Sequence, residues 1–362
     1  MKITYISHAG LLIETDNIRI LMDPWFDGPA YLNQWHLFPK PLAANIESVK
    51  QNVDYILISH GHEDHLHDRT LKQLPKNAKI YYPYQWYETI KNYFRDLGFN
   101  KIKETINFKR YKISNDTYVT YILHNLDSII VIETKGKVLV NLNDALHHSN
   151  KKTIEYYCSL IKSNWNKIDY IFCGYGGASY FPNTIKTSSK NDEEIALIRE
   201  QYFVLNNFMI TNHLNPKYSI PFAADYVLLD PEHIWINETK TKKSSMVQKY
   251  YEMYPEKANK IKMIKMYPGD ILEDFELIKN SKKNHNGLDN LYLEEYKEEI
   301  NRKKNPEIIS GDNALELKNK IINQISNRLF ILKNSFDDLE QFSFNIYLKD
   351  LKSKPYFNIV IR

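Results

Sequence analysis

Short apolar runs that end at polar or turn residues fill the first two thirds of the chain, residues 1–237. Runs of this length, rich in β-branched and aromatic residues, predict buried strands. The expected strands are Ile3–Ser7, Leu11–Thr15, Ile18–Asp23, Tyr55–Ser59, Tyr118–His124, Ser128–Glu133, Lys137–Leu142, Tyr170–Cys173 and Tyr218–Phe222. Helical stretches alternate with them, over Leu66–Leu74, Tyr87–Leu97, Asn150–Lys162 and Asp192–Asn207. This alternation predicts an α/β sandwich, with two sheets inside and helices outside.

The pattern changes at about residue 238. Residues 240–304 are crowded with Lys and Glu, and we expect them to pack as helices on the outside of the first domain. In Asn313–Lys333 apolar residues recur at helical spacing, whereas Gln341–Leu348 and Tyr356–Ile361 alternate as paired strands do. The sequence therefore predicts two parts: an α/β domain over 1–237 and a helical and α+β extension over 238–362.

Composition and charge narrow the class of protein. Of the 362 residues, 43% are apolar and 25% are charged, which are globular values. A formal charge of +4 is too near balance to predict nucleic-acid binding. Two cysteines cannot build a disulfide framework or hold an iron–sulfur cluster by four thiolates. With no signal-peptide core and no 18-residue apolar run, we expect a cytoplasmic protein without a membrane span. Nothing in the sequence indicates the oligomeric state.

Four of the twelve histidines lie within residues 60–67, immediately after an apolar run. The pattern is His-x-His-x-Asp-His, made by His60, His62, Asp64 and His65. On an extended loop, histidines at i and i+2 project to the same side and can hold one cation. The Asp and the next His enter a helical turn and can face a second cation about 3.5–4 Å away. Because imidazole and carboxylate suit Zn, Fe or Mn, we expect one or two divalent transition-metal ions here.

This motif resembles the signature of the metallo-β-lactamase superfamily, and further segments extend the resemblance over about residues 1–237. These segments are Ser7–Gly10, Leu21–Phe26, Gly28–Tyr31, Asp127–Ser128, Asn141–Asp144, Pro216–Ala223 and Asp230–His233. Their combination looks like the branch that contains the catalytic domain of CMP-N-acetylneuraminate hydroxylase. More distantly it is similar to N-acylphosphatidylethanolamine phospholipase D and L-ascorbate-6-phosphate lactonase. The resemblance implies an αββα sandwich for the first domain, and makes that domain the metal-binding, catalytic one.

Position by position, the resemblance implies two metal sites. The implied ligands are His60, His62 and His124 for the first ion, and Asp64, His65 and Asp144 for the second. Asp144 stands where the superfamily has a bridging aspartate. Asp23 matches an early aspartate that supports the site without binding the metal.

One expected ligand is missing. The superfamily usually supplies another histidine after a late strand, and no histidine directly follows Tyr218–Phe222. Six residues remain open as additional or substitute ligands: His8, His147, His148, His213, Asp225 and His233. With a ligand missing, we expect a tight first site and a weaker second one.

An aromatic loop that ends in prolines follows Asp23. It can wall a substrate pocket through Trp25, Tyr31, Trp35 and His36, or it can simply pack on its own aromatic rings. The glycines of Gly174–Gly177 lack the G-x-G-x-x-G order in front of a helix, so we expect no dinucleotide site.

These features favour a metal-dependent hydrolase of a small or medium polar metabolite, cleaving an ester, lactone, amide or phosphodiester bond. Bound metal would lower the pKa of a water, with Asp64 and Asp144 as the candidate catalytic residues. The alternative is a non-haem (di)iron oxygenase acting on a nucleotide-sugar or an amine. The resemblance associates that activity with a Rieske iron–sulfur module. We expect that module to be absent from this chain, which has only two cysteines and starts directly at the β-lactamase-like part, so a separate electron-donor protein would be needed. The intact motif argues against a third interpretation, a non-catalytic scaffold.

Overall fold

The structure is a computed structural model that describes residues 1–15, 17–84, 89–177, 191–278, 291–305, 316, 319–324, 342–346 and 357–361. The chain forms two compact units, Met1–Lys304 and Asn305–Arg362. In the second unit, β18 (Phe342–Ile346) pairs antiparallel with β19 (Phe357–Ile361), which confirms the predicted strand pair. Most of the helix predicted over Asn313–Lys333 lies outside the described residues.

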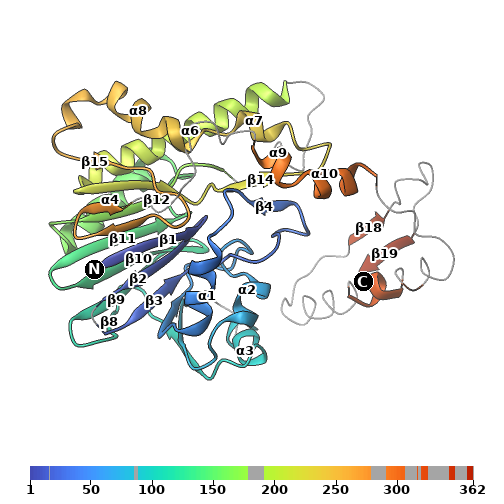
Figure 1. Cartoon of the computed structure of the whole chain (residues 1–362), viewed down its shortest axis with the longest axis horizontal. Coiled ribbons are helices and arrows are strands. Elements are labelled where there is room, and N and C mark those ends of the chain that lie inside the picture. Colours follow the sequence, from blue (N-terminus) through green and yellow to red (C-terminus); the bar gives the residue numbers. More distant parts are fainter. Residues whose placement is uncertain are drawn as a thin grey trace. The chain divides into compact units, whose positions relative to one another are not determined.

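The first unit contains two large sheets that face each other (Figure 1). Among the described residues, the first sheet has eight strands in the order β17-β16-β1-β2-β3-β5-β6-β7. Their bounds are β1 (Lys2–Ser7), β2 (Gly10–Glu14), β3 (Arg19–Met22), β5 (Tyr55–Leu57), β6 (Lys79–Pro83), β7 (Lys101–Thr105), β16 (Ile271–Glu273) and β17 (Glu276–Ile278). The strands β3, β5, β6 and β7 run parallel, and the others pair antiparallel.

The second sheet has seven described strands in the order β15-β13-β12-β11-β10-β9-β8. Their bounds are β8 (Arg110–Lys112), β9 (Thr117–His124), β10 (Asp127–Thr134), β11 (Lys137–Asn143), β12 (Tyr170–Gly174), β13 (Tyr218–Phe222) and β15 (Lys262–Met263). A separate ribbon joins β4 (Trp35–Leu37) to β14 (Tyr226–Leu228).

Helices cover the outer face of each sheet (Figure 1). Against the first sheet lie α1 (Ala43–Gln51), α2 (Asp68–Gln73) and α3 (Thr89–Asp96), and against the second lie α4 (Lys151–Asn164) and α6 (Asp192–Leu214). The remaining helices are α7 (Ile236–Thr239), α8 (Lys243–Met253), the 3-10 turn η1 (Pro255–Lys257), α9 (Leu291–Glu295) and α10 (Lys297–Lys304). None of the described helices combines the length and the apolar character that crossing a bilayer requires.

Burial on both faces explains why the strands read as continuous apolar runs. Along β1, Ile3 and Tyr5 join the core between the sheets, whereas Ile6 joins the core under α1–α3. In the second sheet Ile130 faces the inner core and Ile129 faces α4 and α6. Sheets covered on both faces need such two-sided hydrophobicity. The predicted α/β sandwich is therefore confirmed, with helices outside both sheets.

The division of the chain differs from the one predicted at residue 238, because residues 238–304 are part of the first unit. Strand β15 extends the second sheet beside β13, and β16 extends the first sheet, with Lys2 opposite Glu273. The Lys-rich and Glu-rich composition concealed these short strands. Strand β15 lies at the edge of its sheet, and an edge strand needs few apolar residues, because one of its sides has no neighbouring strand.

Candidate metal centre

The histidines and aspartates singled out in the sequence gather where several central strands end. Asp23 directly follows β3, the segment 59–65 follows β5, and Asp144 follows β11. The carboxyl ends of parallel strands in α/β folds form such crevices. Three residues here adopt left-handed backbone conformations, with φ of 43° at His8, 38° at Asp23 and 52° at Asn143. Such conformations cost about 1–3 kcal/mol each and concentrate at functional sites.

Asp23 lies behind the cluster and orients it. Its Oδ1 accepts the backbone N–H of Ser59 at 2.7 Å, and its Oδ2 accepts the Ser59 hydroxyl at 2.6 Å. The same Oδ2 lies 3.0 Å from Nδ1 of His65. A carboxylate that accepts a hydrogen bond from Nδ1–H fixes the tautomer of a histidine and leaves the lone pair of Nε2 free.

The Nε2 atom of His65 is buried and makes no hydrogen bond to any described residue. It lies 3.5 Å from Oδ2 of Asp64 and 3.5 Å from Oδ2 of Asp144. Asp64 is in turn held by His8, whose Nε2 is 3.0 Å from Oδ2, and by the hydroxyl of Tyr31, which donates to Oδ1. An unpaired imidazole nitrogen between two carboxylates is the geometry that a divalent cation completes.

A second group of side chains converges on His60, beside the group around His65. The Nδ1 atom of His60 lies 2.9 Å from the Ser59 hydroxyl, which turns Nε2 toward Nδ1 of His62 at 2.8 Å. The same Nε2 is 3.7 Å from Oδ1 of Asp127 and 3.9 Å from Oδ2 of Asp144. Two groups able to hold an ion therefore share His60: one with His65 and Asp144, the other with His62 and Asp127.

His124 belongs to a neighbouring group with Asp127 and His148. Its Nε2 is 3.1 Å from the Ser149 hydroxyl, and its Nδ1 has no hydrogen-bond partner among the described residues. Asp127 was not among the sequence candidates for ligands, and it links this group to His60. The register of the predicted hairpin could have revealed Asp127 as a ligand candidate, because a two-residue turn places it directly opposite His124.

The electrostatics of the cluster are those of crowded carboxylates and imidazoles. Burial opposes charge on His65, but the carboxylates of Asp144 and Asp64 outweigh it and raise the His65 pKa well above its usual value. Burial and the neighbouring His65 lower the pKa of His60. Burial and the nearby Asp144 raise the pKa of Asp127 to about 6. Without a cation, negative charge is thus concentrated around one imidazole.

The aromatic loop borders this cluster. The backbone N–H of Tyr31 donates to Glu63 at 2.6 Å, and the Tyr31 ring packs edge-on against Trp35 with centroids 4.8 Å apart. Trp35 stacks on Tyr226 at 3.5 Å. Trp25 packs edge-on against His8 at 5.3 Å, so three of the four proposed loop residues wall the cluster. The fourth, His36, lies apart and packs edge-on against Tyr296 at 5.3 Å.

The other candidate ligands divide into near and distant residues. His8 and His148 fall in groups able to hold an ion. His147 lies beside His148 but places Nε2 3.1 Å from the carbonyl of Gly176. Like His147, the candidates His213, Asp225 and His233 belong to none of the described groups. Asp225 instead pairs with Lys243 at 2.6 Å, and His233 lies 3.7 Å from Asp230.

The donor set fits divalent transition metals. Each described group combines two imidazoles with one carboxylate, a set used for zinc and for non-haem iron alike. The orphaned Nε2 of His65 and the Asp23 contact behind it match the way proteins orient metal-binding histidines.

Comparison with known proteins agrees with this geometry. Residues 2–156 match the family model described as Beta-lactamase superfamily domain. The cytidine monophosphate-N-acetylneuraminic acid hydroxylase of Pongo pygmaeus is 28% identical over 254 residues, and that of Danio rerio is 27% identical over 261 residues. Each alignment covers 67% of this chain and 41% of the relative, so the chain spans less than half the length of these curated relatives. The resemblance inferred from the motifs is confirmed.

Solved structures of both enzyme classes share the fold. CmlA, a diiron β-hydroxylase from Streptomyces venezuelae, is 13% identical with a TM-score of 0.51, covering 77% of this chain and 54% of CmlA. An isothiocyanate hydrolase from Delia radicum gut bacteria is 12% identical with a TM-score of 0.50, covering 75% of this chain and 99% of that enzyme. At these identities the likeness concerns the fold alone.

Proposed function

Because residues 2–156 belong to the β-lactamase superfamily and contribute to a buried cluster of histidines and aspartates, we propose that the chain is a metal-dependent hydrolase of small polar metabolites. The bond cleaved is an ester, lactone, amide or phosphodiester bond. The observation that carries the proposal is the unpaired Nε2 of His65, 3.5 Å from the carboxylates of both Asp64 and Asp144.

The proposed ligands are those of the two groups that share His60, with Asp64 and His124 beside them. A divalent ion bound there supplies a water of lowered pKa and stabilises negative charge that develops on the substrate. Burial opposes ionisation of Asp64, but His65 and His8 outweigh it and lower the Asp64 pKa. Asp64 is therefore an acceptor, and the contacts from Tyr31 and His8 fix its two oxygens so that it can orient the attacking water.

A second candidate function is a non-haem iron oxygenase, which two observations favour. Every described group of possible ligands is a two-histidine, one-aspartate set, the arrangement of many non-haem iron oxygenases. The curated relatives at 27–28% identity are named as hydroxylases of cytidine monophosphate-N-acetylneuraminic acid. Insertion of one atom of O₂ into a C–H bond needs two electrons and two protons, with the second oxygen leaving as water. For this reaction we propose that an electron-donor protein delivers those electrons.

Metal content and reaction type together test the proposal. Protein purified without added metal is analysed for zinc, iron and manganese, then reconstituted with each ion. It is assayed against a panel of ester, lactone, amide and phosphodiester substrates. Oxygen uptake is measured separately, with a reduced electron donor and CMP-N-acetylneuraminate. Hydrolysis that follows zinc or manganese supports the hydrolase. Near-stoichiometric iron with oxygen uptake and no hydrolysis overturns it in favour of the oxygenase.

Variants locate the metal. His60→Ala and His62→Ala should each lose most of the bound metal and at least about 100-fold in activity, because loss of a direct ligand weakens a site more than the 10–100-fold cost of losing an outer contact. His213→Ala is the matched control, since His213 belongs to no described group of possible ligands. Full metal occupancy in both His60→Ala and His62→Ala would refute the assignment.

A further inference from the structure

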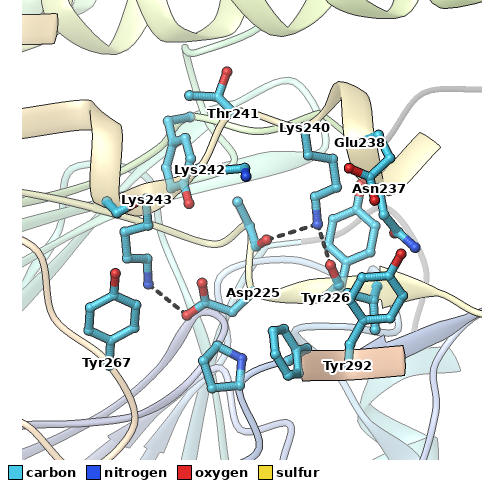
Figure 2. A pocket seen from close by; sticks show the side chains of 16 residues that line it. Asp225, Tyr226, Asn237, Glu238, Lys240, Thr241, Lys242, Lys243, Tyr267 and Tyr292 are labelled. Atoms are coloured by element: carbon cyan, nitrogen blue, oxygen red, sulfur yellow. Dashed lines mark hydrogen bonds and ion pairs between the residues drawn. The ribbon is translucent and has the colours of Figure 1, made fainter. Parts of the chain in front are cut away.

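A cavity of about 100 Å³ lies between the segment that leads into β14 and the start of α8. Its lining includes Asp225, Tyr226, Lys240, Thr241, Lys242 and Lys243, and it is called here the lysine pocket. Figure 2 shows the side chains of Lys240 and Lys243 both directed toward the segment that carries Asp225 and Tyr226. Three lysines within four residues line this one small cavity, and Lys242 is the most exposed of them.

All three N–H groups of the Lys243 ammonium have acceptors within the protein. The ammonium donates to Asp225 at 2.6 Å, to the Tyr5 hydroxyl at 3.0 Å and to the carbonyl of Met266 at 3.1 Å. An ammonium has three donors, so none is left for a ligand. The Asp225 charge is neutralised in the same contact.

Lys240 differs, because no described carboxylate pairs with it. Its ammonium donates to the backbone carbonyls of Ala224, at 3.1 Å, and Tyr226, and no described residue accepts its third N–H. The side chain also lies over the Tyr226 ring, 3.4 Å from the centroid. Burial lowers the Lys240 pKa to about 8, so the ammonium is charged at neutral pH. A desolvated cation bonded only to neutral carbonyls is poorly compensated.

The nearby carboxylates do not neutralise the positive charge of Lys240. The carboxylate of Glu200 is buried and already has partners. It accepts the backbone N–H groups of Thr241, at 3.2 Å, and Gly177, at 3.4 Å, and it lies 3.5 Å from the guanidinium of Arg199. Glu238 lines the pocket as one further carboxylate. The start of α8 adds partial positive charge, because its N-cap residue makes no side-chain capping bond and its first turn contains no acidic residue.

The size of the cavity restricts the ligand. A cavity of about 100 Å³ has room for one phosphate or carboxylate group. The Tyr226 ring has Lys240 over one face and Trp35 stacked at 3.5 Å on the other. The lysine pocket is therefore separated from the aromatic wall of the metal centre by a single ring.

We propose that the lysine pocket binds the phosphate or carboxylate group of a small anionic metabolite, with the third N–H of Lys240 and the start of α8 as the donors. The site is distinct from the metal cluster and does not depend on the reaction proposed above. A charge-assisted hydrogen bond from a partly buried ammonium is the kind of contact that selects an anion over a neutral group.

Calorimetric titration of the full chain with inorganic phosphate, and separately with acetate, tests the proposal. Lys240→Met should weaken binding at least about tenfold, because it removes the buried charge. Lys249→Met makes the same change at an exposed position of α8 and should leave the affinity unchanged. If Lys240→Met does not fold, Lys240→Gln gives the same comparison, since it keeps donors for the carbonyls and removes only the charge.

A third variant separates this pocket from the metal centre. His60→Ala should still bind phosphate with the wild-type affinity, whether or not the enzyme is a hydrolase. If phosphate binding disappears in His60→Ala, the anion occupies the metal centre and the proposal is wrong. Absence of phosphate and acetate binding to the wild-type chain, or equal affinity in the Lys240 and Lys249 variants, would also overturn it.

Discussion

Asp225 forms a buried ion pair with the ammonium of Lys243. Its position just after β13 makes it a natural substitute for the missing histidine ligand. In the fold its carboxylate points instead to Lys243 and Tyr5, and it takes part in no described group of possible ligands. Both members of the ion pair are buried, with exposures of 4% and 5%. We therefore assign Asp225 a structural role.

Substitution of Asp225 tests this role. Asp225→Asn should lower the free energy of unfolding by about 3–5 kcal/mol, because it leaves the Lys243 ammonium buried without its counter-charge. Metal content should stay at the wild-type value. The double variant Asp225→Leu with Lys243→Met should recover much of the loss, since it removes both charges. Denaturant unfolding and elemental analysis measure the two effects, and loss of metal from a folded Asp225→Asn protein would restore the ligand interpretation.

At this scale the sequence predicted much of the cluster, because the His-x-His-x-Asp-His spacing is local. It missed Asp127, which becomes a neighbour of His124 only through the register of the β9–β10 hairpin. It also could not separate His8 and His148, which join the cluster, from His213 and His233, which do not. Spacing along the chain carries no information about such distant contacts.

At the scale of elements, the ribbon of β4 and β14 was the hardest to foresee. The sequence suggested an aromatic loop, whereas Trp35 to Leu37 form a strand opposite Leu228 to Tyr226. The two partners are far apart in sequence and each is only three residues long, too short for an alternation pattern. Within this ribbon His36 is 6% exposed and packs against Tyr296, between α9 and α10.

The ribbon should be acid-sensitive through His36. Burial, with help from Lys303, lowers the His36 pKa to about 4, whereas the unfolded chain has a value near 6.5. Below pH 6.5 the unfolded chain takes up a proton that the folded protein refuses, so the stabilisation present above pH 6.5 is lost as the pH falls toward 4. Relative to His36→Gln, the wild type should lose about 2 kcal/mol of unfolding free energy between pH 7 and 4.5. Denaturant unfolding of both proteins measures this difference. If their unfolding free energies change equally with pH, His36 does not make the ribbon acid-sensitive.

At the scale of the whole molecule, the sandwich itself was predictable and the extent of its domain was not. Two-sided apolar runs and the histidine motif together specify two covered sheets. The late strands β15, β16 and β17 are short and polar, and only their pairing with β13 and β1 shows that they complete the sheets. The domain predicted to end at residue 237 therefore lacks three strands of the two sheets and the Lys243 partner of Asp225.

Truncation distinguishes the two boundaries. A chain that stops after Lys304 should stay soluble, unfold cooperatively and bind as much metal as the full chain, because every described group of possible ligands lies within Met1–Lys304. A chain that stops after Asn237 should be insoluble or unfolded, because it exposes the edges of β1 and β13 and leaves Asp225 buried without its cation. Solubility, thermal melting and metal analysis measure this, and a well-folded 1–237 fragment would restore the earlier boundary.

Because β1 pairs with β16, the first sheet can be completed only late in translation. One of the two strand neighbours of Lys2, Glu273, is translated some 271 residues after it. At about 5–20 residues per second, the ribosome needs roughly 14–54 s to deliver that partner. Throughout this interval the nascent chain carries a finished β1–β2–β3 meander with one bare edge. Chaperones that shield exposed strand edges should therefore engage this protein during translation, before its last sheet strand has emerged.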